Sequence, residues 1–161
     1  MNAIEMLKKQ HREVAKLFER FQQAKSADGR QQLFEQIADK LAIHATIEEQ
    51  HFYPSVKNKA TDDLLLESVE EHLEMKRIIA DLLVLDPEDE HYAAKVKVLQ
   101  ENVEHHVGEE ETELFPKVAE SIDEEILEAL AADMEETQSE LLDEGDPRDA
   151  IPDETDEAAP V

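Results

Sequence analysis

An internal repeat constrains the fold of this chain more than any other feature. The segment HATIEEQHFYP at residues 44–54 returns 62 positions later as HVGEEETELFP at residues 106–116, with histidine, glutamate, an aromatic residue and proline at matching places. The segment before it, residues 4–21, matches residues 65–82 when shifted by 61 positions. Such self-similarity indicates two copies of one structural unit.

Each copy of the repeat has the pattern of a helical hairpin. Apolar residues recur every three or four positions through residues 4–21, 34–52, 65–82 and 96–114, which places them on one stripe of each of four helices. Glycine is scarce, and Glu, Leu, Ala and Lys dominate, a composition that favours helix over strand. Because an amphipathic hairpin cannot bury its stripe alone, the two are predicted to form an antiparallel four-helix bundle. The predicted fold class is all-α.

Helix-breaking residues mark the ends of the predicted helices. Pro54 and Pro116 are predicted to end or kink the second and fourth helices, because proline lacks a backbone N–H and its ring clashes with the preceding turn. Ser121 followed by Glu124 has the capping-box form and opens a predicted fifth helix. The bundle and this helix together form one predicted domain, residues 1–142.

The C-terminal residues 143–161 differ in composition from the bundle. They contain eight acidic residues against one basic residue, with few large apolar side chains. Such a segment cannot bury enough apolar surface to offset its ordering entropy. We therefore predict a disordered acidic tail.

The formal net charge of −26 narrows the range of partners. Nucleic acids and anionic membranes are disfavoured, because binding them depends on clustered Lys and Arg. The chain has no cysteine, so any metal must be held by nitrogen and oxygen atoms. No run approaches the ~18 apolar residues of a transmembrane helix, and no signal-peptide pattern precedes the first helix. We expect a cytoplasmic monomer that acts on small molecules, with a partner protein as an open alternative.

Four histidines and two glutamates occupy the inward stripes of the predicted bundle. They are His11, His44, Glu48, His72, His106 and Glu110. Each hairpin supplies one histidine from its first helix and a His-x-x-x-Glu pair from its second, and residues four apart lie on one helix face. Burying two carboxylates without a compensating cation would cost on the order of several kcal/mol each. We therefore predict that these six residues bind metal.

The types of ligand suggest which metal and what chemistry. Imidazoles and carboxylates without thiolates suit iron, manganese or zinc, and six protein ligands indicate two ions. If both glutamates bridge, each ion receives two nitrogens and two oxygens, and a solvent-derived oxo or hydroxo bridge adds a fifth ligand. One position on each ion would then remain open for O2, peroxide or nitric oxide.

Three motifs occur twice in the chain: a spaced histidine, His-x-x-x-Glu-Glu, and an aromatic residue followed by proline. On these motifs the chain resembles, over residues 1 to about 142, the hemerythrin-like proteins of the HHE cation-binding type. This resemblance implies that the six residues hold two iron ions per chain. The O2-carrying hemerythrins have a further histidine one turn after the one in the third helix, where this chain has Lys76. A symmetric centre is implied, and sensing, peroxide decomposition or iron handling is favoured over O2 carriage. Weak peroxidase- or catalase-like activity is an open question.

Two other classes of protein compete with this interpretation. Ferritin-like di-iron proteins need a Glu-x-x-His pair on two helices, but within the predicted helices only Glu48 to His51 has that form. An acidic helical adaptor with a purely structural metal site is the second alternative. A structural site is coordinatively closed and is often zinc.

Histidines outside the six need separate interpretation. His105 competes with His106, but His106 precedes Pro116 by ten residues just as the histidine of the first copy precedes its proline, so we expect His105 at the rim. His51 lies two helical turns after the first-copy histidine and is expected at the rim of the site or as an extra base or ligand. His91 lies in a polar loop and is expected in solvent. Lys76 is expected to extend its ammonium outward to water.

Aromatic residues precede both prolines of the repeat. Tyr53 and Phe115 are expected to pack in the core, and Tyr53 could also reach the metal cluster and offer a phenol to it.

Overall fold

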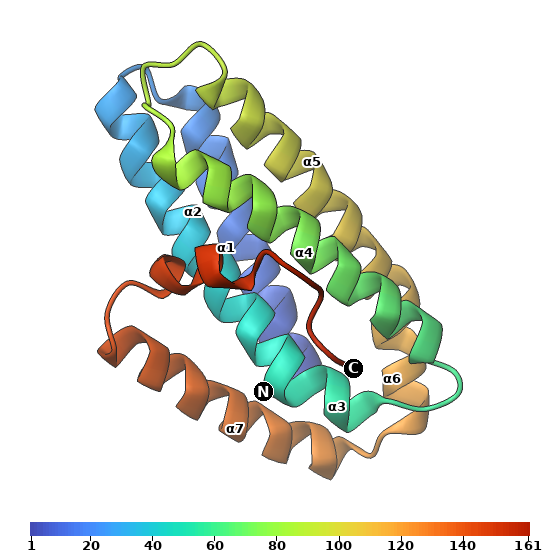
Figure 1. Ribbon diagram of the computed structural model, residues 1–161. Coiled ribbons are helices and arrows are strands. Elements are labelled where there is room, and N and C mark those ends of the chain that lie inside the picture. The colour runs from blue at the N-terminus through green and yellow to red at the C-terminus, as the bar shows by residue number, and fades with distance from the viewer.

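The computed structural model describes all residues from 1 to 161, and every element in it is helical (Figure 1). Four long helices form a bundle: α1 (Ala3–Gln23), α2 (Ala27–Ile47), α4 (Asp62–Val84) and α5 (Tyr92–Glu109). Helix α1 packs on α2 and α4 packs on α5, and each pair is antiparallel. These two hairpins confirm the predicted all-α bundle. None of the helices combines the length and the apolar composition needed to cross a membrane.

Side-chain caps define where the helices of the first hairpin begin. The Asn2 side chain accepts a hydrogen bond from the Glu5 N–H at 2.9 Å, and the Glu5 carboxylate accepts one from the Asn2 N–H at 3.0 Å. At the start of α2, the Ser26 hydroxyl accepts a hydrogen bond from the Gly29 N–H at 3.0 Å. Each cap stabilises its helix by about 0.5–2 kcal/mol. The caps therefore fix where α1 and α2 begin.

The second helix of each hairpin continues through a widened turn. The π-helical turns η1 (Glu48–Phe52) and η2 (Glu110–Leu114) lead into α3 (Tyr53–Val56) and α6 (Phe115–Ser121). In η1 the N–H of Tyr53 donates to the carbonyl of Glu48, five residues earlier. The helices therefore do not end at Pro54 and Pro116, and a kink there stays a prediction. The wider turn accommodates a residue that has no N–H and that would clash in a regular α-turn.

A layer of polar residues divides the apolar core in two. One cluster of 17 buried residues, including Leu7, Ile47 and Phe52, lies at the end of the bundle that holds α3 and α6. A second cluster of 16 buried residues, including Phe18 and Phe34, lies at the other end. Burying one such side chain contributes about 1.5–3 kcal/mol. Because the clusters are similar in size, the polar layer lies near the middle of the bundle and has apolar packing on both sides.

The fifth helix, α7 (Glu124–Asp143), is confirmed and packs against α1 and α2. Its N-cap is Asp123 and not the predicted Ser121, because Ser121 completes α6 and its hydroxyl donates back to the Lys117 carbonyl at 2.9 Å. On its inner face α7 buries Leu130 and Met134 in the first apolar cluster.

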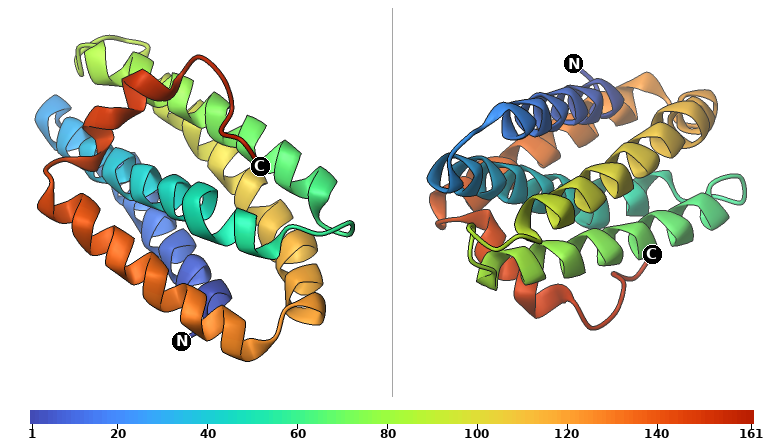
Figure 2. Two further views of the ribbon diagram at one scale, coloured as in Figure 1. Left: turned by 60° about the horizontal axis from the view of Figure 1, so that its bottom comes forward. Right: turned by 90° about the horizontal axis from the view of Figure 1, so that it is seen from above.

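The predicted disorder of the C-terminal tail is wrong. Residues Pro147–Glu154 form a 3-10 helix, η3, that crosses the bundle against α2 and α4 (Figure 2). Ile151 is 2% exposed and joins the second apolar cluster. The Arg148 guanidinium lies 2.8 Å from a Glu35 oxygen and 2.9 Å from an Asp39 oxygen on α2. Composition predicted a solvated segment, but one apolar anchor and one cation facing two carboxylates are enough to dock it.

Limited trypsin digestion tests this docking. Because the Arg148 peptide bond lies within the docked helix, the native chain should resist cleavage there, whereas Ile151→Asp should free the segment and expose the bond to trypsin. Mass spectrometry of the products would identify the cut. The control Val84→Asp adds the same charge at a residue that is 89% exposed, and should leave the site protected. Rapid cleavage of the unaltered chain at Arg148 would contradict the docked position.

Candidate metal centre

Each of the four long helices turns one histidine into the polar layer. These residues are His11 on α1, His44 on α2, His72 on α4 and His106 on α5, and all four are buried. Their Nε2 atoms point toward one another. The Nε2 atoms of His11 and His44 are 3.2 Å apart, and those of His72 and His106 are also 3.2 Å apart. The two hairpins therefore contribute one close histidine pair each.

Two carboxylates join the histidine pairs across the bundle. Glu48 and Glu110 are the first residues of the two π-turns and are 0% and 1% exposed. Glu48 Oε1 lies 3.0 Å from His44 Nε2 in its own hairpin and 3.1 Å from His72 Nε2 in the other. Glu110 Oε1 lies 3.2 Å from both His106 Nε2 and His11 Nε2. Each glutamate therefore contacts a histidine of both hairpins.

The six residues divide into two groups, each of which could hold a metal ion. One is His11 with His44 and Glu110, and the other is Glu48 with His72 and His106. Two ligands at right angles around an ion, each about 2.1 Å from it, are about 3 Å apart, which is close to the observed spacing. The structure thus brings together all six residues singled out from the sequence, and their role as ligands stays a prediction.

A second side chain holds each imidazole from the outside. The pairs, given as the distance from histidine Nδ1 to oxygen, are His11 with Glu111 at 2.7 Å, His44 with Gln10 at 2.7 Å, His72 with Glu49 at 2.7 Å, and His106 with Glu71 at 2.8 Å. When Nδ1–H donates to such an oxygen, Nε2 is left with a lone pair that faces the centre. All four imidazoles are therefore prearranged to bind a cation.

Sequence reasoning missed these four outer partners, although the repeat contained a signal for them. Glu49 and Glu111 each follow a central glutamate directly, and they correspond under the 62-residue shift. Gln10 and Glu71 each precede a central histidine directly, and they correspond under the 61-residue shift. Polar residues that stand next to the predicted ligands in both copies of the repeat could therefore have predicted these outer partners.

The buried imidazoles and carboxylates shift one another's pKa values. Burial on its own would lower the pKa of His44, but the neighbouring Glu48 and Glu110 raise it to about 9. The pKa of His106 is likewise raised well above its usual value, because Glu110 outweighs the effect of burial. Burial and Glu110 act to raise the pKa of Glu48, yet His44 and His106 lower it to about 2. Without metal, imidazolium protons supply the positive charge that these carboxylates require.

One oxygen in the layer has no partner of its own. Glu48 Oε2 is buried and accepts no hydrogen bond. An unpartnered buried oxygen on an ionised carboxylate is costly, and such atoms usually have an unseen partner such as water or an ion. The other oxygen of the same carboxylate, Oε1, lies 3.0–3.7 Å from the Nε2 atoms of three central histidines. The carboxylate therefore fits a bound metal ion. Nitrogen and oxygen ligands of this kind suit iron, manganese or zinc.

Tyr53 makes the centre asymmetric. Its hydroxyl donates to Glu110 Oε2 at 2.9 Å and lies 3.3 Å from His72 Nε2, which confirms that it reaches the cluster. Phe115 has the equivalent position in the repeat and stacks on His11 with ring centroids 5.9 Å apart. Burial, Glu110 and the second central carboxylate raise the pKa of Tyr53 well above its usual value, so the phenol stays protonated.

Lys76 does not extend to water as predicted. It is 8% exposed, and its Nζ lies 3.0 and 3.1 Å from the two Glu49 oxygens and 3.0 Å from a Glu154 oxygen. Burial alone would lower the pKa of Lys76, but Glu49 and Glu154 raise it. The prediction was wrong because it treated the C-terminal segment as solvated, whereas that segment supplies one of the two carboxylates that neutralise the ammonium.

The remaining histidines lie outside the centre. His51 Nε2 lies 2.6 Å from the Thr137 hydroxyl on α7, because the π-turn turns it away from the face that regular helical spacing assigned to it. The His105 side chain is 64% exposed, which confirms its rim position, and it lies 3.2 Å from Glu71. The His91 side chain is 71% exposed and is solvated as expected.

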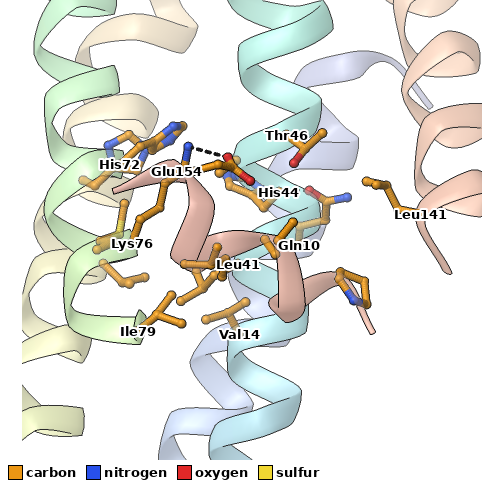
Figure 3. A pocket seen from close by; sticks show the side chains of 18 of the residues that line it. Gln10, Val14, Leu41, His44, Thr46, His72, Lys76, Ile79, Leu141 and Glu154 are labelled. Carbon is orange, nitrogen blue, oxygen red and sulfur yellow. Dashed lines mark hydrogen bonds and ion pairs between the residues drawn. The ribbon is translucent and has the colours of Figure 1, made fainter. Parts of the chain in front are cut away.

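A cavity of about 60 Å³ adjoins the centre (Figure 3). More than half of its lining residues are hydrophobic, among them Val14, Met75, Ile79 and Val103. All four central histidines line it, but neither central glutamate does. A small molecule in this cavity would therefore approach the centre from the histidine side.

Comparisons with known proteins agree with the fold and the site. The family model described as the hemerythrin HHE cation binding domain matches residues 2–118. A crystal structure of a hemerythrin HHE cation-binding domain-containing protein from Mycobacterium kansasii resembles the chain with a TM-score of 0.78 and 27% identity, covering 94% of this chain and 97% of that one.

A curated relative from Nostoc sp., named a DNA nickase, is 28% identical over 141 residues. The match includes 88% of this chain but only 40% of the relative. The chain thus spans well under half the length of this relative.

Substitution of two adjacent histidines separates a ligand from a rim residue. His106→Ala removes an inward Nε2 and should abolish or halve the bound metal, while His105→Ala should leave the metal content nearly unchanged. Elemental analysis of both variants, with helicity checked by circular dichroism, gives the comparison. Equal losses in the two variants would contradict the assignment of His106.

The stabilisation that a metal provides should increase as the pH rises. The pKa of His44 in the folded chain is raised from 6.5 to about 9, so protonated His44 stabilises the metal-free fold fully below pH 6.5, and this contribution is lost as the pH rises through 9. A metal ion needs the neutral ring, so protons compete with it across this range. Melting temperatures with and without Zn²⁺ should therefore diverge from pH 6.5 to pH 9. A constant difference would show that His44 does not bind the ion.

Proposed function

The chain belongs to the hemerythrin HHE cation-binding domain family, and on that premise we propose that it is a non-haem di-iron protein. Its centre reacts with O2, peroxide or nitric oxide in sensing, stress response or iron handling. The observation that carries the proposal is the pair of buried groups, each with two histidines and one glutamate, joined by two carboxylates that contact both hairpins. Bound iron would supply one-electron chemistry and an exchangeable position for a small molecule.

The surrounding residues support oxidation chemistry. Glu49, Glu71 and Glu111 accept hydrogen bonds from three of the four histidines, which raises the basicity of the imidazoles and favours a more highly charged metal. Tyr53 donates a hydrogen bond to Glu110 and so keeps one oxygen of that carboxylate oriented. These groups hold the ligands in place while the charge of the centre changes.

Lys76 weakens the case for reversible O2 carriage. Its ammonium has no lone pair and is already bound to Glu49 and Glu154, so it cannot act as a further nitrogen ligand. The centre then has the four-histidine, two-glutamate set, which we expect to be oxidised by O2 and not to hold it for later release. We further propose that the protein acts as a cytoplasmic monomer on small molecules.

We do not extend the nickase activity of the Nostoc relative to this chain. A DNA-bound protein neutralises phosphates with clustered Lys and Arg, whereas this chain has 16 basic against 42 acidic residues. The match covers only 40% of that relative.

Iron stoichiometry tests the proposal directly. Chain purified from iron-replete cells should contain about two iron atoms, because the six ligands form two groups. It should absorb in the near-UV and visible range, and the reduced protein should be oxidised on mixing with O2 in a stopped-flow spectrometer. One ion per chain, or a colourless zinc protein after iron reconstitution, would instead favour the structural site of an adaptor. Colour that bleaches under vacuum and returns with air would indicate an O2 carrier.

A further inference from the structure

The C-terminal segment forms one wall of the cavity that leads to the four histidines. Pro147, Ala150, Ile151 and Glu154 line the cavity together with side chains of the long helices. In Figure 3 the ribbon of η3 passes between α2 and α4, in front of the cavity. This wall lies outside the part of the chain that matches the family domain, which ends at residue 118.

Polar contacts hold this wall at both of its ends. At its start, Arg148 pairs with Glu35 and Asp39 of α2. At its end, Glu154 pairs with Lys76 of α4 at 3.0 Å, and Arg77 donates to the carbonyl of the next residue at 3.0 Å. Ile151 fills the space between these contacts and is almost fully buried. The segment therefore spans from α2 to α4 and covers the cavity between them.

Lys76 connects the wall to the metal centre. The same ammonium that pairs with Glu154 also contacts both oxygens of Glu49, and Glu49 in turn holds His72 at 2.7 Å. A buried lysine at this point requires both carboxylates, because burial without them would disfavour its charge. The charge balance around Lys76 therefore favours the wall in place over the cavity, because the wall supplies Glu154.

The dimensions and lining of the cavity limit what can pass. Its volume is about 60 Å³, whereas an apolar cavity of roughly 150 Å³ is known to hold benzene. A space of this size accepts a diatomic molecule, hydrogen peroxide or a xenon atom, but not an aromatic ring. The walls also disfavour ions, because most of the lining is hydrophobic and the ammonium of Lys76 is already paired with Glu49 and Glu154.

We propose that residues 146–161 are a selectivity element, in which Ile151 and the Lys76–Glu154 pair restrict access to the metal centre to small uncharged molecules. This inference rests on the proposed function, since it assigns the size and charge of the substrate at the same centre. It gives Lys76 a role in closing the cavity, and it gives the acidic tail a role in specificity.

Ligand binding to the full chain tests the closure without using any reaction of the metal. Unaltered chain should bind xenon but not benzene, as followed by chemical shifts in NMR spectra. Ile151→Ala removes three carbons from the wall and should allow benzene to bind, because the cavity grows toward the roughly 150 Å³ that holds it. Benzene binding to the unaltered chain, or no gain of benzene binding in Ile151→Ala, would overturn the proposal. Failure of the di-iron assignment would leave these results unchanged.

Peroxide selectivity of the iron-loaded chain provides a second test of the proposal. The rate ratio of hydrogen peroxide to cumene hydroperoxide should fall by about tenfold in Glu154→Gln, because a wall that has lost its ion pair opens more often. The matched control Asp153→Asn removes a carboxylate from the same segment at an exposed residue that pairs with no cation, and should keep the original ratio. An unchanged ratio in Glu154→Gln, or an equal fall in Asp153→Asn, would contradict the role of the Lys76–Glu154 pair.

Discussion

Two carboxylates buried in the middle of an apolar bundle require positive charge, and much of the structure is arranged to meet that requirement. Glu48 and Glu110 are inaccessible to water and have large apolar clusters on both sides. Only groups within the layer can compensate them, either as imidazolium protons or as bound cations. Because each carboxylate contacts histidines of both hairpins, the same charge balance joins the two halves of the repeat. Folding, metal affinity and proton binding are therefore coupled at one place.

The departures from twofold symmetry are as informative as the repeat itself. Three imidazoles are held by carboxylates, but the fourth is held by the neutral side chain of Gln10, where the second copy has Glu71. The phenol of Tyr53 hydrogen-bonds to one central glutamate, while Phe115 offers nothing to the other. The two halves of the centre thus differ in outer charge and in hydrogen bonding. Two ions bound there would experience different surroundings despite similar ligands.

Sequence reasoning identified the bundle and the six central residues because the repeat and the helical period point to the same inward face. It could not identify local features that break that period. His51 was assigned to the rim of the centre by counting two regular turns, but it lies inside a π-turn, whose wider spacing directs it to α7. The tail was misjudged because composition averages over a segment, whereas docking depends on Ile151 and Arg148 meeting complementary groups on α2. Such pairings between distant segments are not visible in local patterns.

The order in which the chain is synthesised gives the C-terminal wall a further consequence. All four histidine-bearing helices precede residue 110, so they leave the ribosome before the segment that closes the cavity. At about 5–20 residues per second, the bundle is exposed for several seconds before residues 146–161 emerge. During that interval the side of the bundle that η3 later covers is open. The position of one short segment in the chain thus decides when this side of the centre becomes covered.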